Sequence, residues 1–143
     1  MTTGAIAARL GGAPVLHHEI QTDFDLLAAL AEGLPAGAID FLLGDGGLTP
    51  DEVHLLIIPR RTLALRRQRG QPLTADESDR LARVARVLAF AEETFANRDK
   101  ASRWLRKANR GLGGKIPLQL LSSETGGRLV EQALGRIAHG VFA

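Results

Sequence analysis

TADESDRLARVARVLAFAEETF, residues 74–95, is the stretch that decides the fold. Thr74 followed by Glu77 forms a capping box, in which both side chains bind the free N–H groups at a helix start. Apolar residues then recur at intervals of three and four, which is the spacing of one helical face. They are Leu81, Val84, Ala85, Leu88, Ala91 and Phe95. The stretch therefore predicts one long amphipathic helix that packs against the rest of the chain.

Two shorter helices are predicted immediately upstream. Thr49-Pro50-Asp51-Glu52 combines a capping residue, a proline at the first helical position and a glutamate that reaches back. Pro59 interrupts the apolar run that follows, because its ring prevents helical continuity with the preceding turn. A second helix then covers 60–69 and ends at Gly70. Two short helices joined by a tight turn are typical of a helix-turn-helix unit.

The remaining N-terminal residues divide into helices and an arm. Thr22 caps a helix that ends at Gly33, and a shorter helix covers 36–43. The apolar side of the first of these is expected to consist of Phe24, Leu27, Ala28, Leu30 and Ala31. Residues 1–21 show no sustained period and are predicted to be a flexible arm.

Helices also dominate the C-terminal half. They are predicted at 98–108 and from about 125 to 138, with a glycine-rich loop at 109–115 between them. No β-period of two is sustained, so the predicted fold class is all-α, with roughly seven helices. A division near Gln71-Pro72 separates a helix-turn-helix region for DNA binding and dimerisation, residues 22–71, from a helical C-terminal domain, residues 72–143.

Composition and motifs exclude several classes of function. The 143 residues include no Cys, so no disulfide or thiolate metal site can form, and a reducing cytoplasm is the expected location. No apolar run approaches the ~18–20 residues that span a bilayer, so no membrane partner is expected. The glycine loop before Lys115 fails the phosphate-loop template, and no serine has the setting of a nucleophile. We therefore expect a non-enzyme that has neither a metal nor a cofactor.

Basic residues concentrate in the second helix of the predicted pair. No acidic residue lies between Glu52 and Asp76, whereas five arginines fall within residues 60–69. Arginine binds phosphates and guanine edges through two donors at once. We predict that DNA is contacted by Arg60, Arg61, Thr62, Arg66, Arg67 and Arg69. The alternative is that these arginines form a solvated face on a packed helix.

The chain ends on an apolar tripeptide, Val141-Phe142-Ala143. The preceding helix is expected to be anchored by Leu129, Val130, Ala133, Leu134 and Ile137, and Gly140 fits its C-terminal cap. The residues beyond the anchor are predicted to bind a concave site on a partner protein. They are His139, Gly140, Val141 and Phe142, together with Arg136 from the last turn of the anchored helix. In the alternative, Phe142 folds back onto the chain's own helices.

Short motifs in a fixed order also carry a family resemblance. In the C-terminal half they are Ala101-x-x-Trp104-Leu105, Asn109-x-x-Leu112-Gly113-Gly114, Pro117-Leu118-x-Leu120-Leu121, Thr125-Gly126 and Leu134-x-Arg136-Ile137-x-His139-Gly140-Val141. Upstream they are Arg61-Thr62-Leu63 through Arg67, then Gly70, Leu73, Glu77-Ser78 and Arg80-Leu81. In this order, over about residues 24–143, they resemble the Xre/MbcA/ParS type of antitoxin, with its Xre-like helix-turn-helix and its C-terminal toxin-binding domain.

The resemblance implies a function in a toxin–antitoxin system. Such antitoxins are encoded beside a toxin with a RES domain, which consumes NAD by hydrolysis or phosphorolysis or uses it for ADP-ribosylation. The resemblance implies that the C-terminal segment covers the NAD pocket of the cognate RES-domain toxin. It also implies that homodimers bind operator DNA and repress their own operon. The alternative is a plain helix-turn-helix regulator whose C-terminal half only dimerises and which has no toxin partner.

Overall fold

The computed structural model describes residues 1–140, and these residues form helices and loops without a β-strand. The elements are α1 (Thr3–Arg9), α2 (Ala13–Leu16), α3 (Asp23–Glu32), α4 (Gly37–Gly44), α5 (Pro50–Leu56), α6 (Arg60–Arg69), α7 (Ala75–Phe95), α8 (Arg98–Arg106), the 3-10 helices η1 (Arg110–Leu112) and η2 (Pro117–Ser122), and α9 (Glu124–Ala138). The predicted all-α fold class is confirmed. Within this part of the chain no single helix is long and apolar enough to cross a membrane. Helices α3 and α4 together have the necessary length and apolar composition, but the chain bends by 111° between them.

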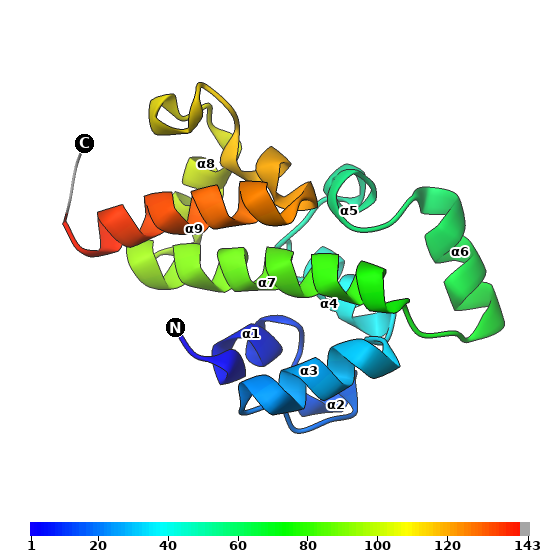
Figure 1. Cartoon of the computed structure of the whole chain (residues 1–143). Coiled ribbons are helices and arrows are strands. Elements are labelled where there is room, and N and C mark those ends of the chain that lie inside the picture. The colour runs from blue at the N-terminus through cyan, green and yellow to red at the C-terminus, as the bar shows by residue number, and fades with distance from the viewer. Residues whose placement is uncertain (141–143) are drawn as a thin grey trace.

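Helix α7 lies at the centre of the molecule. Its capping box forms as predicted, because the Thr74 side chain accepts from Glu77 N–H and the Glu77 side chain accepts from Thr74 N–H. Helices α8 and α9 pack on one side of α7, whereas α1 and α3 pack on the other (Figure 1). Buried side chains of α7 therefore serve both sides, among them Leu81, Val84 and Val87. One continuous hydrophobic core results, which extends across the predicted division near residues 71–72.

The N-terminal segment corrects one prediction. Residues 1–21 hold two helices, α1 and α2, in place of a flexible arm. Ile6, Leu10, Leu16 and Ile20 are buried in the core. Their spacing shows no sustained period, because the two helices have only seven and four residues and glycines separate them. Short elements of this kind are stabilised by tertiary packing and have little periodicity of their own.

The orientation of α3 corrects a second prediction. The helix begins and ends as expected, with a full capping box between Thr22 and Asp25. However, Leu26 and Ala29 face the core, while Phe24 is 82% exposed and Leu27 is 64% exposed. The helix is apolar on two sides, so its sequence pattern does not determine which side is buried.

Helix α9 packs closely on α7 and η2. Gly126 lies against the carbonyl oxygen of Leu120, and a Cβ at Gly127 would lie 2.9 Å from Cδ of Arg83. These glycines let the first turn of α9 approach its neighbours, and Val130, Ala133 and Leu134 continue the buried face. Leu129, which was expected to help anchor the helix, is 44% exposed.

Candidate functional site

The α5–turn–α6 unit is held in one geometry by side chains on both sides of the turn. Thr49 and Glu52 form the predicted capping box at the start of α5, and Pro59 precedes α6. The two carbonyl groups of the turn are satisfied: Arg80 Nε donates to Ile57 O at 2.8 Å, and His54 Nδ1 donates to Ile58 O at 3.0 Å. Ile57 and Ile58 are themselves buried. The turn therefore fixes the direction of α6 relative to α5.

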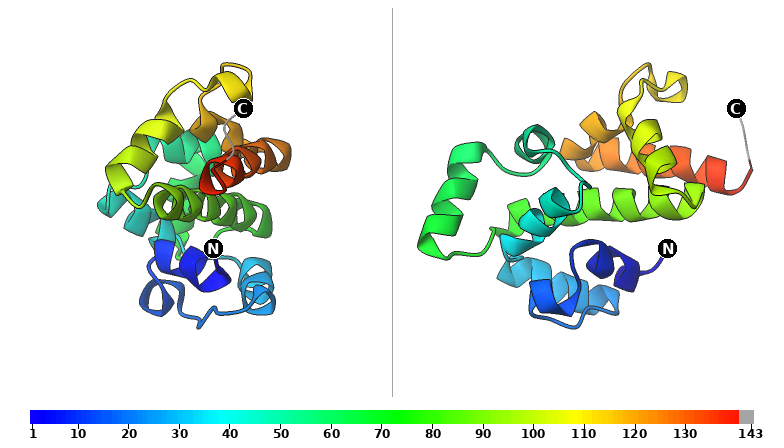
Figure 2. Two further views of the ribbon diagram at one scale, coloured as in Figure 1. Left: turned by 90° about the vertical axis from the view of Figure 1, so that its left-hand side faces the viewer. Right: turned by 180° about the vertical axis from the view of Figure 1, so that it is seen from behind.

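Helix α6 stands out from the body of the molecule. It lies at one end, beyond the first turn of α7, with most of its surface facing solvent (Figures 1 and 2). Leu63 is its buried residue, and Gly70, in the left-handed region at φ 61°, ends it. Because only one side of α6 packs against the protein, its opposite side is accessible, and a helix needs such an accessible side to enter a major groove.

The structure divides the predicted DNA-contacting arginines into two groups. Arg66 is mostly buried and donates through two nitrogens to Glu77, at 3.2 and 3.1 Å, while Arg67 is paired with Asp40. Burial raises the pKa of Glu77, but hydrogen bonds from Thr74 N–H and Arg66 outweigh it and hold that pKa below its ordinary value. Arg66 therefore joins α6 to α7, and a role for it as a free phosphate ligand does not fit this geometry.

The other predicted residues lie on the accessible side of α6. Arg61 and Arg69 are exposed and form no ion pair within residues 1–140. Arg60 is also exposed, 4.0 Å from Asp51, and Thr62 is half-buried. The structure thus brings Arg60, Arg61 and Arg69 to an open surface and leaves Arg66 and Arg67 in ion pairs.

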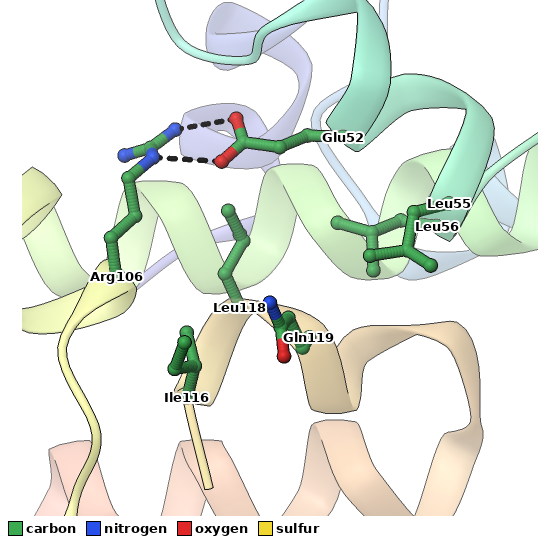
Figure 3. A pocket seen from close by; sticks show the side chains of 7 residues that line it. All are labelled: Glu52, Leu55, Leu56, Arg106, Ile116, Leu118 and Gln119. Carbon is green, nitrogen blue, oxygen red and sulfur yellow. Dashed lines mark hydrogen bonds and ion pairs between the residues drawn. The ribbon is translucent and has the colours of Figure 1, made fainter.

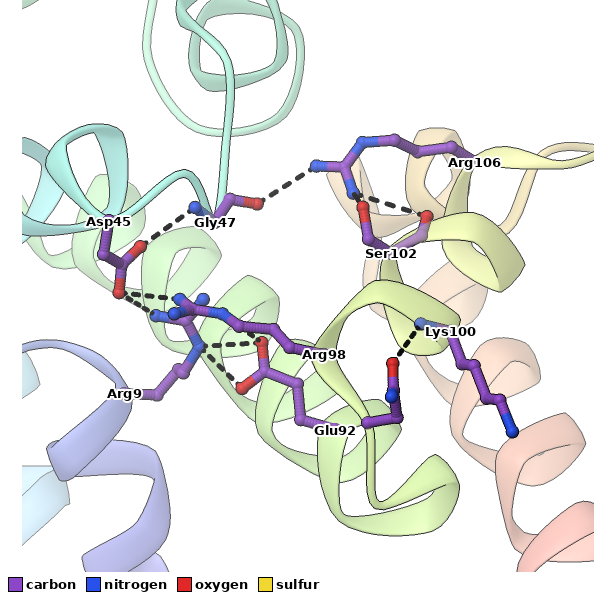
Figure 4. Close-up of polar contacts among 9 residues, drawn as sticks. Arg9, Asp45, Gly47, Glu92, Arg98, Lys100, Ser102 and Arg106 are labelled. Carbon is purple, nitrogen blue, oxygen red and sulfur yellow. Dashed lines mark hydrogen bonds and ion pairs between the residues drawn. The ribbon is translucent and has the colours of Figure 1, made fainter.

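Arg106 connects the helix-turn-helix unit to the C-terminal half. Its Nε and Nη2 each lie 2.8 Å from an oxygen of Glu52 (Figure 3). Nη2 also donates to Gly47 O at 3.0 Å (Figure 4). Burial raises the pKa of Glu52, but hydrogen bonds from Arg106 and Thr49 outweigh it and hold that pKa below its usual range. This pair borders a pocket of about 190 Å³ that Leu55, Ile116 and other residues line between α5 and η2. The start of α5 is therefore tied to the end of α8.

A second ionic cluster joins the N-terminal helices to α7 and α8 (Figure 4). Arg9, almost fully buried, binds Asp45 at 2.7 Å and Glu92 at 3.0 Å, and Arg98 binds the same two carboxylates at 2.8 and 3.5 Å. Burial raises the pKa of Asp45, but the two arginines and Gly47 N–H lower it further than burial raises it. Arg9 and Asp45 are distant in sequence from each other and from Glu92 and Arg98, so no local pattern could have revealed the cluster.

The predicted partner-binding end of α9 lies at the opposite end of α7 from α6 (Figures 1 and 2). Arg136 and His139 are exposed there, and Gly140 follows the cap in the left-handed region at φ 70°. Val141 and Phe142 lie outside the described residues. Two accessible surfaces are therefore separated by the length of the central helix.

The described residues show no arrangement typical of a metal site. Residues 1–140 contain no group of three or more His, Asp or Glu side chains placed to hold a metal ion. The ionised side chains that are buried or half-buried are mostly engaged in pairs that connect helices. The exposed candidates among the described residues are the open face of α6 and the end of α9.

Comparison with known proteins matches both halves of the chain. Residues 25–86 match the family described as the antitoxin Xre-like helix-turn-helix domain, and residues 90–140 match the antitoxin Xre/MbcA/ParS C-terminal toxin-binding domain. The two matched regions meet within α7, later in the chain than the division predicted near residues 71–72.

Two relatives extend the similarity over most of the chain, and a third covers about half of it. A protein named Antitoxin Xre from Pseudomonas putida is 43% identical over 122 residues, which cover 85% of this chain and 76% of that protein. Antitoxin Xre of Photorhabdus laumondii is 36% identical over 124 residues, or 82% and 81% of the two chains. The Prs ADP-ribosylating antitoxin of a Sphingobium species is 31% identical over 83 residues, or 52% of each chain.

Proposed function

This chain belongs to the Xre/MbcA/ParS family of antitoxins, and from that premise we propose that it neutralises a RES-domain toxin. The toxin consumes NAD or uses it to ADP-ribosylate a target, and the C-terminal segment of the antitoxin covers its NAD site. The observation that carries the proposal is the match of residues 90–140 to a toxin-binding domain that ends at the exposed tip of α9. The name of the Sphingobium relative, which refers to ADP-ribosylation, supports an NAD-using partner.

The architecture of α9 suits a mechanism in which the segment simply occupies the toxin's site. Val130 and Leu134 are fully buried, so the helix is rigidly attached to the body. Arg136 and His139, near its end, are exposed and charged or polar, as a contact with a nucleotide-binding pocket requires. Filling such a pocket needs a complementary shape and no catalysis. The antitoxin therefore acts without an enzymatic step or a cofactor.

We further propose that the protein represses its own operon as a homodimer. The helix-turn-helix family match supports binding to DNA, and Arg60, Arg61 and Arg69 lie on the open face of α6. Repressors of this kind bind two half-sites through a two-fold dimer. Because α6 and the end of α9 lie at opposite ends of α7, one copy can contact operator and toxin together.

Coexpression with the neighbouring RES-domain toxin tests neutralisation. A chain truncated after Ala138 lacks the segment that covers the NAD site and should fail to restore growth and cellular NAD. The matched control is the full-length chain with Arg61→Ala and Arg69→Ala, which should still rescue, because its changes lie at the other end. Circular dichroism and immunoblotting establish that both variants fold and accumulate. Full rescue by the truncated chain would overturn the covering mechanism.

A further inference from the structure

Helix α3 presents an apolar stripe to solvent. The stripe consists of Phe24, Leu27, Ala28 and Ala31, all of them exposed, at the i, i+3, i+4, i+7 spacing of one helical face. The opposite face of the same helix, with Leu26 and Ala29, is already buried in the core. A helix that is apolar on both sides is normally buried on both sides. We infer that the α3 stripe packs against the α3 stripe of a second copy of this chain, in antiparallel orientation.

The order of large and small residues makes the stripe complementary to itself. A two-fold axis between positions 27 and 28 pairs Phe24 of each copy with Ala31 of the other, and pairs Leu27 with Ala28. Each large side chain then meets a small one, as interdigitated helix packing requires. A two-fold interface needs this reciprocity, because residue i contacts j wherever j contacts i. A parallel pair would place Phe24 against Phe24 and leave Ala31 facing Ala31.

The area of the stripe agrees with the centre of a stable dimer. A Phe side chain offers about 200 Å² when fully exposed, so Phe24, at 82% exposure, presents about 160 Å². With Leu27, at 64% exposure, the large residues of two copies remove roughly 500 Å² of apolar surface from water. A standard interface buries about 1,200–2,000 Å² in total around such an apolar core. The adjoining depression of about 420 Å³, lined by Met1, Leu27 and Arg86 among others, supplies surface for the rim.

Charge at the edges of the stripe is already accommodated within each copy. Glu32 is paired with His18 at 2.8 Å, Asp25 accepts the N–H groups of Gln21 and Thr22, and Asp23 accepts from the Thr3 hydroxyl. Antiparallel packing also sets the positive end of each helix dipole beside the negative end of its partner. The stripe itself carries no ionisable side chain, so its burial desolvates no charge.

The α3 stripe is thereby assigned as the interface of the homodimer, and this assignment rests on the proposed function only in assuming that the chain dimerises. Sedimentation equilibrium of the full chain provides the first test. Leu27→Glu should raise the dimer dissociation constant at least about 100-fold, because each dimer then buries two unpaired carboxylates against apolar surface. Leu55→Glu is the matched control, since Leu55 is 59% exposed on another helix, and it should leave the constant unchanged.

Engineered cysteines provide the second test, in a chain that has no Cys of its own. In the antiparallel pair, residue 28 of one chain and residue 28 of the other are offset by only about 1.5 Å along the helix axis. The two residues at position 31 are offset by about 10.5 Å. Oxidation should therefore link Ala28→Cys dimers readily, but link neither Ala31→Cys nor the control Ala64→Cys on α6.

Several outcomes would overturn the inference. They are a monomeric wild-type chain at micromolar concentration, a dimer that Leu27→Glu does not weaken, and equal linkage through positions 28 and 31. Loss of toxin binding by Leu27→Glu with the dimer intact would assign the stripe to the toxin instead. Toxin neutralisation and operator binding are measured on the same variants. If toxin neutralisation and operator binding both persist although the dimer results contradict the α3 interface, then only the interface is wrong and the proposed function stands.

Discussion

The Arg106–Glu52 pair should couple the stability of the helix-turn-helix unit to that of the C-terminal half. The two side chains are 29% and 19% exposed, and they are joined by two charge-assisted hydrogen bonds of 2.8 Å. Such bonds contribute about 1.5–3 kcal/mol each when shielded from water, and partial exposure reduces that contribution. We therefore expect Arg106→Met, which keeps the aliphatic stem, to cost about 2 kcal/mol of unfolding free energy. Glu52→Gln, which can still cap Thr49, should cost less.

Urea denaturation of the two single variants and the double variant measures the coupling directly. The expected interaction energy is about 1–2 kcal/mol, because the double variant loses the pair only once. Arg110→Met serves as the control for the loss of an exposed arginine and should change stability by less than about 0.5 kcal/mol. An interaction energy below about 0.3 kcal/mol would refute the reasoning that this pair ties α5 to α8.

The pH dependence of the coupling follows from the direction of the Glu52 shift. The pKa of Glu52 in the folded chain lies below its ordinary value of 4.5. Its contribution to stability is therefore fully present above that ordinary value, and it is lost as the pH falls through the folded pKa. The interaction energy should be constant from pH 8 to about pH 5 and decline at lower pH. A coupling that instead grew in acid would contradict the assignment.

Three further predictions concern separate parts of the molecule. Gly126→Ala places a Cβ against a backbone carbonyl and should destabilise the chain by about 1–3 kcal/mol in urea denaturation; an unchanged midpoint would contradict the close approach of α9. Burial raises the pKa of Glu131 more than Arg86 lowers it, so the ionised carboxylate destabilises the fold. Glu131→Gln should therefore raise the melting temperature at pH 7 but leave it unchanged near pH 3, where the carboxyl group is neutral. A lower melting temperature of Glu131→Gln at pH 7 would count against this. Replacing both Arg61 and Arg69 by Ala should reduce the slope of log Kd for operator DNA against log salt by about 2, whereas the control Arg110→Ala should leave the slope unchanged. Equal slopes for the wild type, the double variant and the control would exclude α6 as the phosphate-binding helix.

Local signals at helix ends were sufficient to predict much of the fold. The capping boxes at Thr49 and Thr74 each formed with the predicted partner, and Thr22 caps α3 as predicted, because a cap involves residues only about three positions apart. The α5–α6 pair was predicted for a similar reason: Pro59 prohibits helix continuation wherever the chain folds. The order and spacing of the short motifs also predicted the family, because these motifs are spread over both the helix-turn-helix domain and the C-terminal domain.

What sequence reasoning missed depends on contacts between distant residues. The buried face of α3 was misassigned, because both of its sides are apolar and only packing on α7 selects Leu26 over Leu27. The ion pair of Arg66 was not foreseen, because its partner, Glu77, is eleven positions away and belongs to the next helix. The helices within residues 1–21 are too short to show a period, and their burial follows from tertiary structure alone.

Competition between NAD and the antitoxin for the purified toxin tests the central proposal most directly. If the C-terminal segment covers the NAD site, a non-reactive NAD analogue should weaken binding of the full chain in proportion to its concentration, and binding of the chain truncated after Ala138 should be weak and insensitive to it. The full chain should also inhibit NAD consumption competitively. Unchanged affinity of the full chain at saturating analogue would contradict the account, because one site cannot hold both ligands at once.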